Sequence, residues 1–239
     1  MKRLCFFSTI CAVLLIALCA CDAQTDARIT NSSSAIPESM ETSETWVEIE
    51  STESAPKEEK QIAGGKLVLK ELGTYSGLYP EDGSDEAVEN IAAVLIENVS
   101  EQTCQYCRMC FRIGGEETYF TLSELPAGKS AWVFAENRVT GTENEPYEFL
   151  NDTSVFRSSD TLNGFSWQSG EGSVSLTNNA SENYQNVYVY YKLCGKDGAY
   201  LGGICYRAAV GEIAIGETKT VTAGHFFEGA CEVVGIYSE

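Results

Sequence analysis

The chain has 239 residues, of which 44% are hydrophobic, and a formal net charge of −19. This length is enough for one large domain or two small ones. Because 35 Asp and Glu outnumber 16 Lys and Arg, bulk electrostatics argues against binding to nucleic acid or to an anionic membrane surface.

The first 20 residues have the pattern of a signal peptide. Lys2 and Arg3 give a positive start, and residues 4–20 carry no charge. This apolar segment is short for a membrane-spanning helix, which needs about 20 apolar residues. We therefore expect a signal peptide over residues 1–20.

The end of this leader, Leu18-Cys19-Ala20-Cys21, resembles the lipobox of bacterial lipoproteins. Cys19 departs from that pattern, which more often has Ala, Ser, Thr or Val there. The resemblance implies cleavage before Cys21, diacylglycerol on its sulfur, and a protein anchored on the extracytoplasmic face of the cell membrane. Two acyl chains anchor a protein stably, whereas one holds it marginally. The alternatives are an ordinary secretory leader and an uncleaved anchor.

Residues 21–62 are predicted to be a disordered acidic linker that follows the lipidated N-terminus. They are rich in Ser, Thr and Glu and have almost no apolar periodicity. Such a segment buries too little apolar surface to offset the entropy lost on ordering.

From residue 63 the sequence predicts an all-β fold. Short runs of β-branched and aromatic residues alternate with Gly, Asn and Asp turns, and no long stretch keeps a helical period. The expected strands are 67–69, 92–96, 106–113, 118–122, 130–135, 147–156, 173–176, 186–193, 204–209, 218–223 and 231–237. Residues 195–200, GKDGAY, have the composition of a hairpin turn.

The chain also contains an internal repeat. Residues 94–113 align without gaps on residues 174–193, so that Asn98 corresponds to Asn178. Residues 124–135 align on residues 212–223, so that Gly128 corresponds to Gly216. The second copy carries additional residues near YLGGICYRAAVG. We therefore expect two antiparallel β-sandwich repeats, 63–142 and 143–239, joined in the polar segment 139–146.

Segments such as LPAGKSAWVFAEN and VYVYYKLCGKDGAYLGGICYRAAVGEI resemble lipoproteins of clostridial bacteria. The resemblance covers the chain from residue 67 onward. It implies tandem immunoglobulin-like β-sandwiches and a Gram-positive source. It carries over no active-site residues.

Six cysteines follow the leader, and three of them have a spacing of three residues in TCQYCRMCF. In a strand, residues three apart point to opposite faces, so we expect no metal site here. The repeat places Cys107 at an inward position and Cys104 and Cys110 on the opposite face. The six remain candidates for disulfides or free thiols: Cys104, Cys107, Cys110, Cys194, Cys205 and Cys231.

No other catalytic or cofactor motif stands out. His225 is the one histidine, and we interpret it as a structural residue. There is no Gly-x-Ser-x-Gly elbow and no phosphate-binding Gly-rich loop. Residues 80–86, PEDGSDE, lack EF-hand spacing and are expected to form a solvated turn. We predict no cofactor.

Aromatic residues are the remaining functional signal. Tyr188 and Tyr190 alternate with valines, so the pair is a candidate outward ligand face, which Trp132, Trp167, Tyr200 and Tyr206 could join. Ordinary cross-strand packing is the alternative. We hypothesise a non-catalytic envelope module that binds a protein or a glycan. The alternatives are an envelope hydrolase with an unrecognised site and a structural spacer.

Overall fold

The computed structural model describes residues 59–83, 86–141, 146–158, 162–226 and 229–238. Its regular elements are β-strands and two short 3-10 turns, so the all-β prediction is confirmed. The predicted signal peptide, Cys21 and residues 22–58 of the predicted linker lie outside the described residues.

The first group of strands comprises β1 (Lys60–Ile62), β2 (Leu67–Leu78), β3 (Ala87–Asn98), β4 (Thr103–Ile113), β5 (Glu116–Leu125), β6 (Ser130–Phe134) and β7 (Tyr147–Arg157), with the turns η1 (Ala63–Gly65) and η2 (Pro80–Asp82). The second comprises β8 (Phe165–Gly170), β9 (Ser173–Asn178), β10 (Tyr184–Cys194), β11 (Tyr200–Ile213), β12 (Thr218–Thr222) and β13 (Cys231–Ser238).

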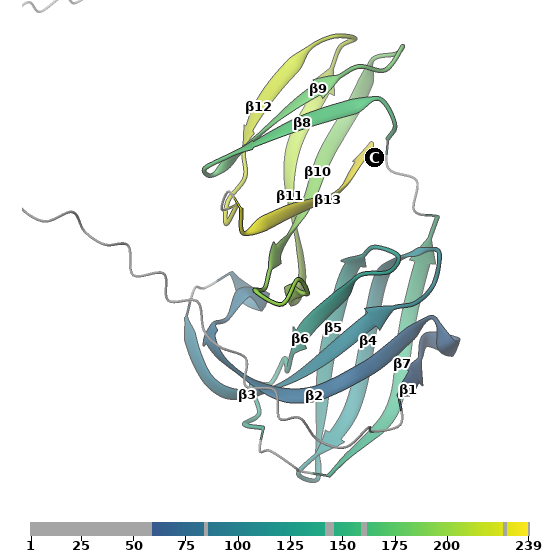
Figure 1. Ribbon diagram of the computed structural model, residues 1–239, viewed down its shortest axis with the longest axis vertical. Helices are drawn as coiled ribbons and strands as arrows, with labels where there is room; N and C mark the ends of the chain where they lie inside the picture. Colours follow the sequence, from purple (N-terminus) through teal and green to yellow (C-terminus); the bar gives the residue numbers. More distant parts are fainter. Residues whose placement is uncertain (1–58, 84–85, 142–145, 159–161, 227–228, 239) are drawn as a thin grey trace, which may run out of the picture. The chain divides into compact units, whose positions relative to one another are not determined.

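The two groups share one pairing scheme. In the first, β3 pairs with β2 and β6, and β4 pairs with β5 and β7; in the second, β9 pairs with β8 and β12, and β10 pairs with β11 and β13 (Figure 1). These pairings are antiparallel. Each group thus has two sheets, and we call the groups copy 1 (residues 60–157) and copy 2 (residues 165–238).

The aligned asparagines make matching hydrogen bonds in the two copies. Asn98 and Asn178 are both 0% exposed, and buried amides need partners for their donors and acceptors. The side-chain nitrogen of Asn98 donates to the backbone oxygens of Gln102 and Leu125. That of Asn178 donates to the backbone oxygens of Glu182 and Ile213, the residues that align with Gln102 and Leu125. The backbone N–H groups of Gly128 and Gly216, at φ of 69° and 74°, donate to Asn98 and Asn178 at 2.8 Å.

Apolar alternation fills a core between the sheets of each copy. The first core includes Val94, Ile96, Phe111, Phe120 and Leu122. The second is built from Val174, Leu176, Val187, Val189 and Tyr191, among others. Copy 2 therefore repeats the inward positions of copy 1 on β3 and β4.

The expected boundary at residue 142 differs from the observed one. Strand β7 pairs with β4 from Arg157 to Tyr147 and packs Tyr147, Phe149 and Phe156 against the first core. It belongs to copy 1 because these side chains complete that core. The join lies between Arg157 and Phe165.

Two further expectations need correction. Residues 60–62, assigned to the disordered linker, form β1 against β2, since Ile62 buries its side chain in the first core. Strand β8 is absent from the expected strands, because the apolar alternation of FSWQSG is weak. In the structure most of its residues are exposed.

Candidate functional site

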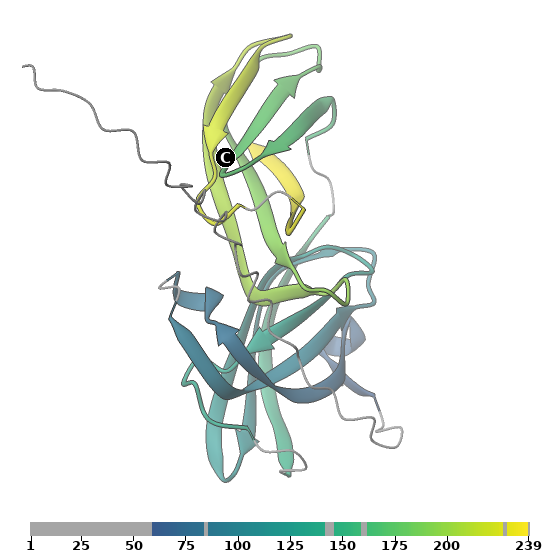
Figure 2. The ribbon, with the colours of Figure 1, turned by 60° about the vertical axis from the view of Figure 1, so that its left-hand side comes forward.

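The additional residues of copy 2 build its contact with copy 1. Strand β11 extends out of copy 2 and pairs in parallel with β6, Tyr200 opposite Ala131 and Leu201 opposite Trp132 (Figure 2). Asp197, in the hairpin before β11, accepts a 2.9 Å hydrogen bond from the indole nitrogen of Trp132. The hairpin covers apolar residues on the outer face of copy 1, including Tyr75, Tyr79 and Phe134.

Within β11, residues 202–205 leave the ladder with β10. Tyr191 pairs with Tyr206, but Leu193 pairs with Leu201. This bulge lies directly against β5: a Cβ added at Gly203 would be 1.9 Å from the carbonyl oxygen of Thr121. Glycine is therefore required there for the two copies to approach.

A half-buried acid and a buried base satisfy the backbone of this bulge. The carboxylate of Glu81, in η2, accepts hydrogen bonds from the N–H groups of Gly203 (2.6 Å) and Ile204 (3.0 Å). The Lys192 side chain is 0% exposed, and its Nζ donates to the carbonyls of Ser123 (2.8 Å), Gly203 (3.1 Å) and Ile204 (2.7 Å). Three acceptors use all three donors of an ammonium group.

The environment shifts both ionisable groups. Burial raises the pKa of Glu81, opposed by its backbone hydrogen bonds and by the positive charge of Lys192. Burial lowers the pKa of Lys192. Electrostatic interactions with Cys205, Glu81, Glu124 and Cys104 act in the opposite direction and raise it. Desolvation disfavours the charged form of each group. We interpret this arrangement as a structural clamp between the copies.

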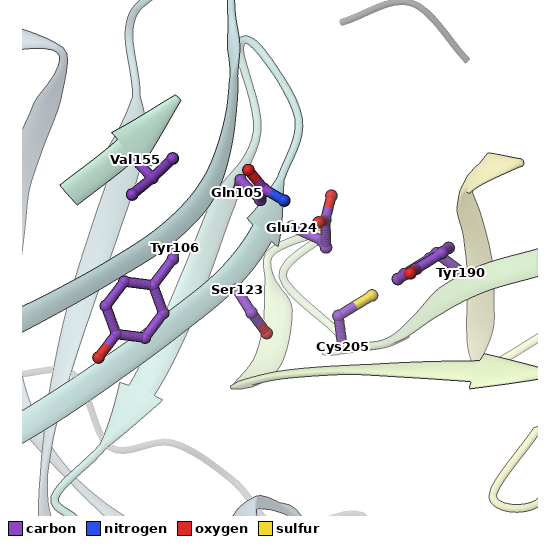
Figure 3. Close-up of a pocket in the computed structure, with 7 residues that line it drawn as sticks. All are labelled: Gln105, Tyr106, Ser123, Glu124, Val155, Tyr190 and Cys205. Carbon is purple, nitrogen blue, oxygen red and sulfur yellow. The ribbon is translucent and has the colours of Figure 1, made fainter. Parts of the chain in front are cut away.

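Beside the clamp lies an open groove with residues from both copies. Its volume is about 440 Å³, and its lining residues are Gln105, Tyr106, Ser123, Glu124, Val155, Tyr190 and Cys205. Figure 3 shows Tyr106 and Val155 on one side, Tyr190 and Cys205 on the other, and Ser123 and Glu124 between them. Tyr106 and Val155 are 37% and 48% exposed. The volume falls in the range typical of ligand sites.

The charges at the groove are paired. Glu124, at φ 49°, accepts a hydrogen bond from the guanidinium of Arg157. That guanidinium stacks 3.5 Å from the ring centre of Tyr237, which meets Tyr190 edge-on at 5.2 Å. Burial raises the pKa of Cys205 to about 11, so its thiol is protonated at neutral pH.

The structure separates the aromatic residues that the sequence suggested. Tyr190 lines the groove, and Tyr188 lies beyond it under the guanidinium of Arg207, 4.9 Å from the ring centre. Trp132 and Tyr200 are buried, and Tyr206 is half-buried beside Tyr191 and His225. Trp167 is exposed on β8, apart from the groove.

The cysteine geometry corrects one expectation. The register of β4 against β7 shifts between Cys104 and Tyr106, and this bulge places Cys104 on the same core face as Cys107. A hydrogen bond with Cys104 and burial raise the pKa of Cys107. Cys110 is buried outside that core cluster. No disulfide joins any two of the six cysteines of the described residues.

The metal-ligating residue types do not gather at one point, and His225 packs against a tyrosine, in the part of the chain that the structure describes. No group of three or more His, Cys, Asp or Glu could hold a metal ion there. The His225 ring stacks on Tyr206, and the Cys231 thiol donates to the backbone oxygen of His225.

A smaller hollow of about 280 Å³ contains two carboxylates, Glu81 and Glu136. Glu81 is committed to the clamp. Glu136 is held by Arg108 and Thr121, which lower its pKa. Both carboxylates therefore serve structural contacts, and we interpret the hollow as part of the interface.

Sequence reasoning missed the copy 1 side of the groove and the clamp. Gln105, Tyr106, Glu124 and Val155 have no motif, and Glu81 was placed in a solvated turn. Asp82 and Glu86 in that turn do lie at the surface, paired with Arg138. The one usable signal was the length difference in copy 2, because an insertion in one repeat marks where it departs from its partner.

Comparisons with protein-family models, curated proteins and solved structures found no match. Among the described residues, no helix has the length and apolar character needed to span a membrane.

Proposed function

We propose that this protein is a non-catalytic binding module that holds an extended ligand in the groove between its two copies. The observation that supports this most strongly is the groove itself, which combines exposed Tyr106 and Val155 with Tyr190 and a polar centre of Gln105, Ser123 and Glu124. Ligand sites typically join apolar and aromatic walls to a few directed polar groups.

The clamp supports the same proposal. Five of the seven lining residues of the groove come from copy 1 and two from copy 2, so its walls keep their spacing only if the copies are fixed to each other. Glu81 joins η2 of copy 1 to β11, and Lys192 joins β5 of copy 1 to β11. Walls held in place before binding reduce the entropy lost on binding.

We propose further that the module is a membrane-anchored lipoprotein with lipid on Cys21, exposed outside the cytoplasm at the cell envelope. The lipobox-like sequence is the support for this. We also propose that each copy is immunoglobulin-like. The six strands that the copies have in common, which leave out β1, pair in an order compatible with strands A, B and E opposite C′, C and F of a variable-type sandwich. Loss of palmitate labelling in Cys21→Ala would support the anchor, and labelling that survives would exclude it.

The binding proposal is tested with two matched valine variants. Val155 and Val99 are 48% and 50% exposed, and only Val155 lines the groove. Labelled envelope fractions are passed over the immobilised wild type, Val155→Asp and Val99→Asp. We expect Val155→Asp alone to lose retention. Equal retention by all three proteins would refute the groove as the binding site.

A further inference from the structure

The chemistry along the groove assigns its ligand to one class, and this inference rests on the proposed function. We propose that the groove binds a neutral oligosaccharide, which lies across both copies with its sugar faces against tyrosine rings.

The first support is the line of aromatic side chains. Tyr106 and Tyr190 lie on opposite sides of the groove (Figure 3). Beyond Tyr190, Tyr237 meets it edge-on, and Tyr188 is opposite Tyr237 in the strand pairing. The guanidinium groups of Arg157 and Arg207 lie over the rings of Tyr237 and Tyr188, so the tyrosine tract that faces the groove consists of Tyr106 and Tyr190. A tract longer than one ring favours a chain of repeating units over a single small molecule.

The second support is the set of polar groups between the two tyrosines. Gln105 offers an amide donor and acceptor, Ser123 a hydroxyl oxygen whose hydrogen is donated to the carbonyl of Gly203, and Glu124 a carboxylate that is paired with Arg157. Together they can both donate to and accept from hydroxyl groups. Apolar ring faces with hydrogen-bonding groups between them match the two kinds of surface that a sugar presents.

The two tyrosines that face the groove do not mark a site for an added peptide strand, although the edge strands β5 and β7 also line it through Ser123, Glu124 and Val155. Tyr106 and Tyr190 come from β4 and β10, and each of these strands is paired on both sides. Strand addition needs a row of unpaired backbone groups at a sheet edge. The backbone of β11 at Gly203 and Ile204 is occupied by Glu81 and Lys192.

The charges favour a neutral ligand. Glu124 is paired with Arg157, so the groove offers no unbalanced carboxylate to a cation. The Lys192 ammonium is enclosed by three carbonyls, and the net charge of −19 repels an anionic polymer at long range. Arg207 lies past the groove, over Tyr188.

The test is calorimetric titration of the full-length chain, purified in detergent, with neutral β- and α-linked oligosaccharides of increasing length. Acidic oligosaccharides and an unrelated peptide serve as comparison ligands. The protein variants are Tyr106→Ala, Tyr190→Ala and, as an exposed aromatic outside the tract, Trp167→Ala. We expect at least one neutral series to bind more tightly as its length grows, with little dependence on salt. Each tyrosine variant should lose about tenfold in affinity, while Trp167→Ala is unchanged.

Two results would overturn the inference in different ways. In the first, no neutral series binds, whereas an acidic oligosaccharide or the peptide binds and Tyr106→Ala weakens that binding. The groove is then the binding site, but the proposed class of ligand is wrong. If the Val155→Asp comparison also shows no role for the groove, the proposed function fails with it. Circular dichroism of each variant verifies that the fold is retained.

Discussion

Glu81 and Lys192 bind the backbone of the same two residues of β11, Gly203 and Ile204, with opposite polarity. Glu81 accepts from the N–H groups of Gly203 and Ile204, and Lys192 donates to their carbonyls. Residues 202–205 have left the ladder with β10, so these backbone groups take their hydrogen bonds from side chains; the Gly203 carbonyl also accepts from the Ser123 hydroxyl. A buried backbone group left without a partner costs about 1–3 kcal/mol. One acid and one base thus replace a missing stretch of strand pairing at the contact between the copies.

The two copies provide a matched pair of basic residues to test this role. Lys192 aligns with Arg112, which lies 44% exposed in an ion pair with Glu148. Lys192→Met removes one donor from each of three carbonyls, of which that of Gly203 keeps the Ser123 hydroxyl. It should lower the free energy of unfolding by about 3–5 kcal/mol. Arg112→Met should cost less than about 1 kcal/mol. Urea unfolding measures both, and equal effects would contradict the clamp.

Gly203 gives a second test of the contact. Gly203→Ala would force a methyl group to within 1.9 Å of the Thr121 carbonyl, whereas a Cβ at Gly224 meets nothing within 4 Å. We expect Gly203→Ala to destabilise the protein by more than about 2 kcal/mol and Gly224→Ala to stay within about 0.5 kcal/mol of the wild type. A thermal unfolding scan compares the two, and a neutral Gly203→Ala would mean that β11 does not approach β5 so closely.

Stability should depend on pH through Glu81. Burial raises its folded-state pKa above 4.5, so the folded protein holds this proton more tightly than the unfolded chain. The stabilisation that this bound proton gives to the folded state is complete below pH 4.5, and it is lost as pH rises through the folded-state pKa. The unfolding free energy of the wild type minus that of Glu81→Gln should therefore fall with rising pH. A difference that grows with pH would mean that the pKa of Glu81 is lowered.

The strands and the repeat could be predicted because they depend on local patterns. Apolar alternation identified most strands, and Asn98, Asn178, Gly128 and Gly216 recur because each turn needs the same amide and the same positive φ. Tertiary contacts could not be predicted this way. A single bulge at Cys104 reverses which face that thiol occupies, and β7 belongs to copy 1 because of side chains that complete a distant core. Arg112 and Lys192 look equivalent in sequence, yet only the second is covered.

The thiols should report burial directly. Cys104, Cys107 and Cys110 are buried and should resist alkylation in the native protein. Cys205 borders the groove, but burial raises its pKa to about 11, so its alkylation should be slow at neutral pH and accelerate toward that value. Peptide mass spectrometry after timed iodoacetamide treatment follows each site. Fast labelling of Cys205 at neutral pH, or any disulfide among the six cysteines, would contradict the structure.

The most direct test of the account is to locate bound ligand by backbone amide NMR of residues 59–239, titrated with whatever envelope material the wild-type protein retains. We predict shift changes that cluster at Gln105, Tyr106, Ser123, Glu124, Val155, Tyr190 and Cys205, from both copies at once. Changes confined to one copy away from these residues, such as the outer Ser and Thr side chains of β9 and β12, would contradict the claim that the groove is the binding site.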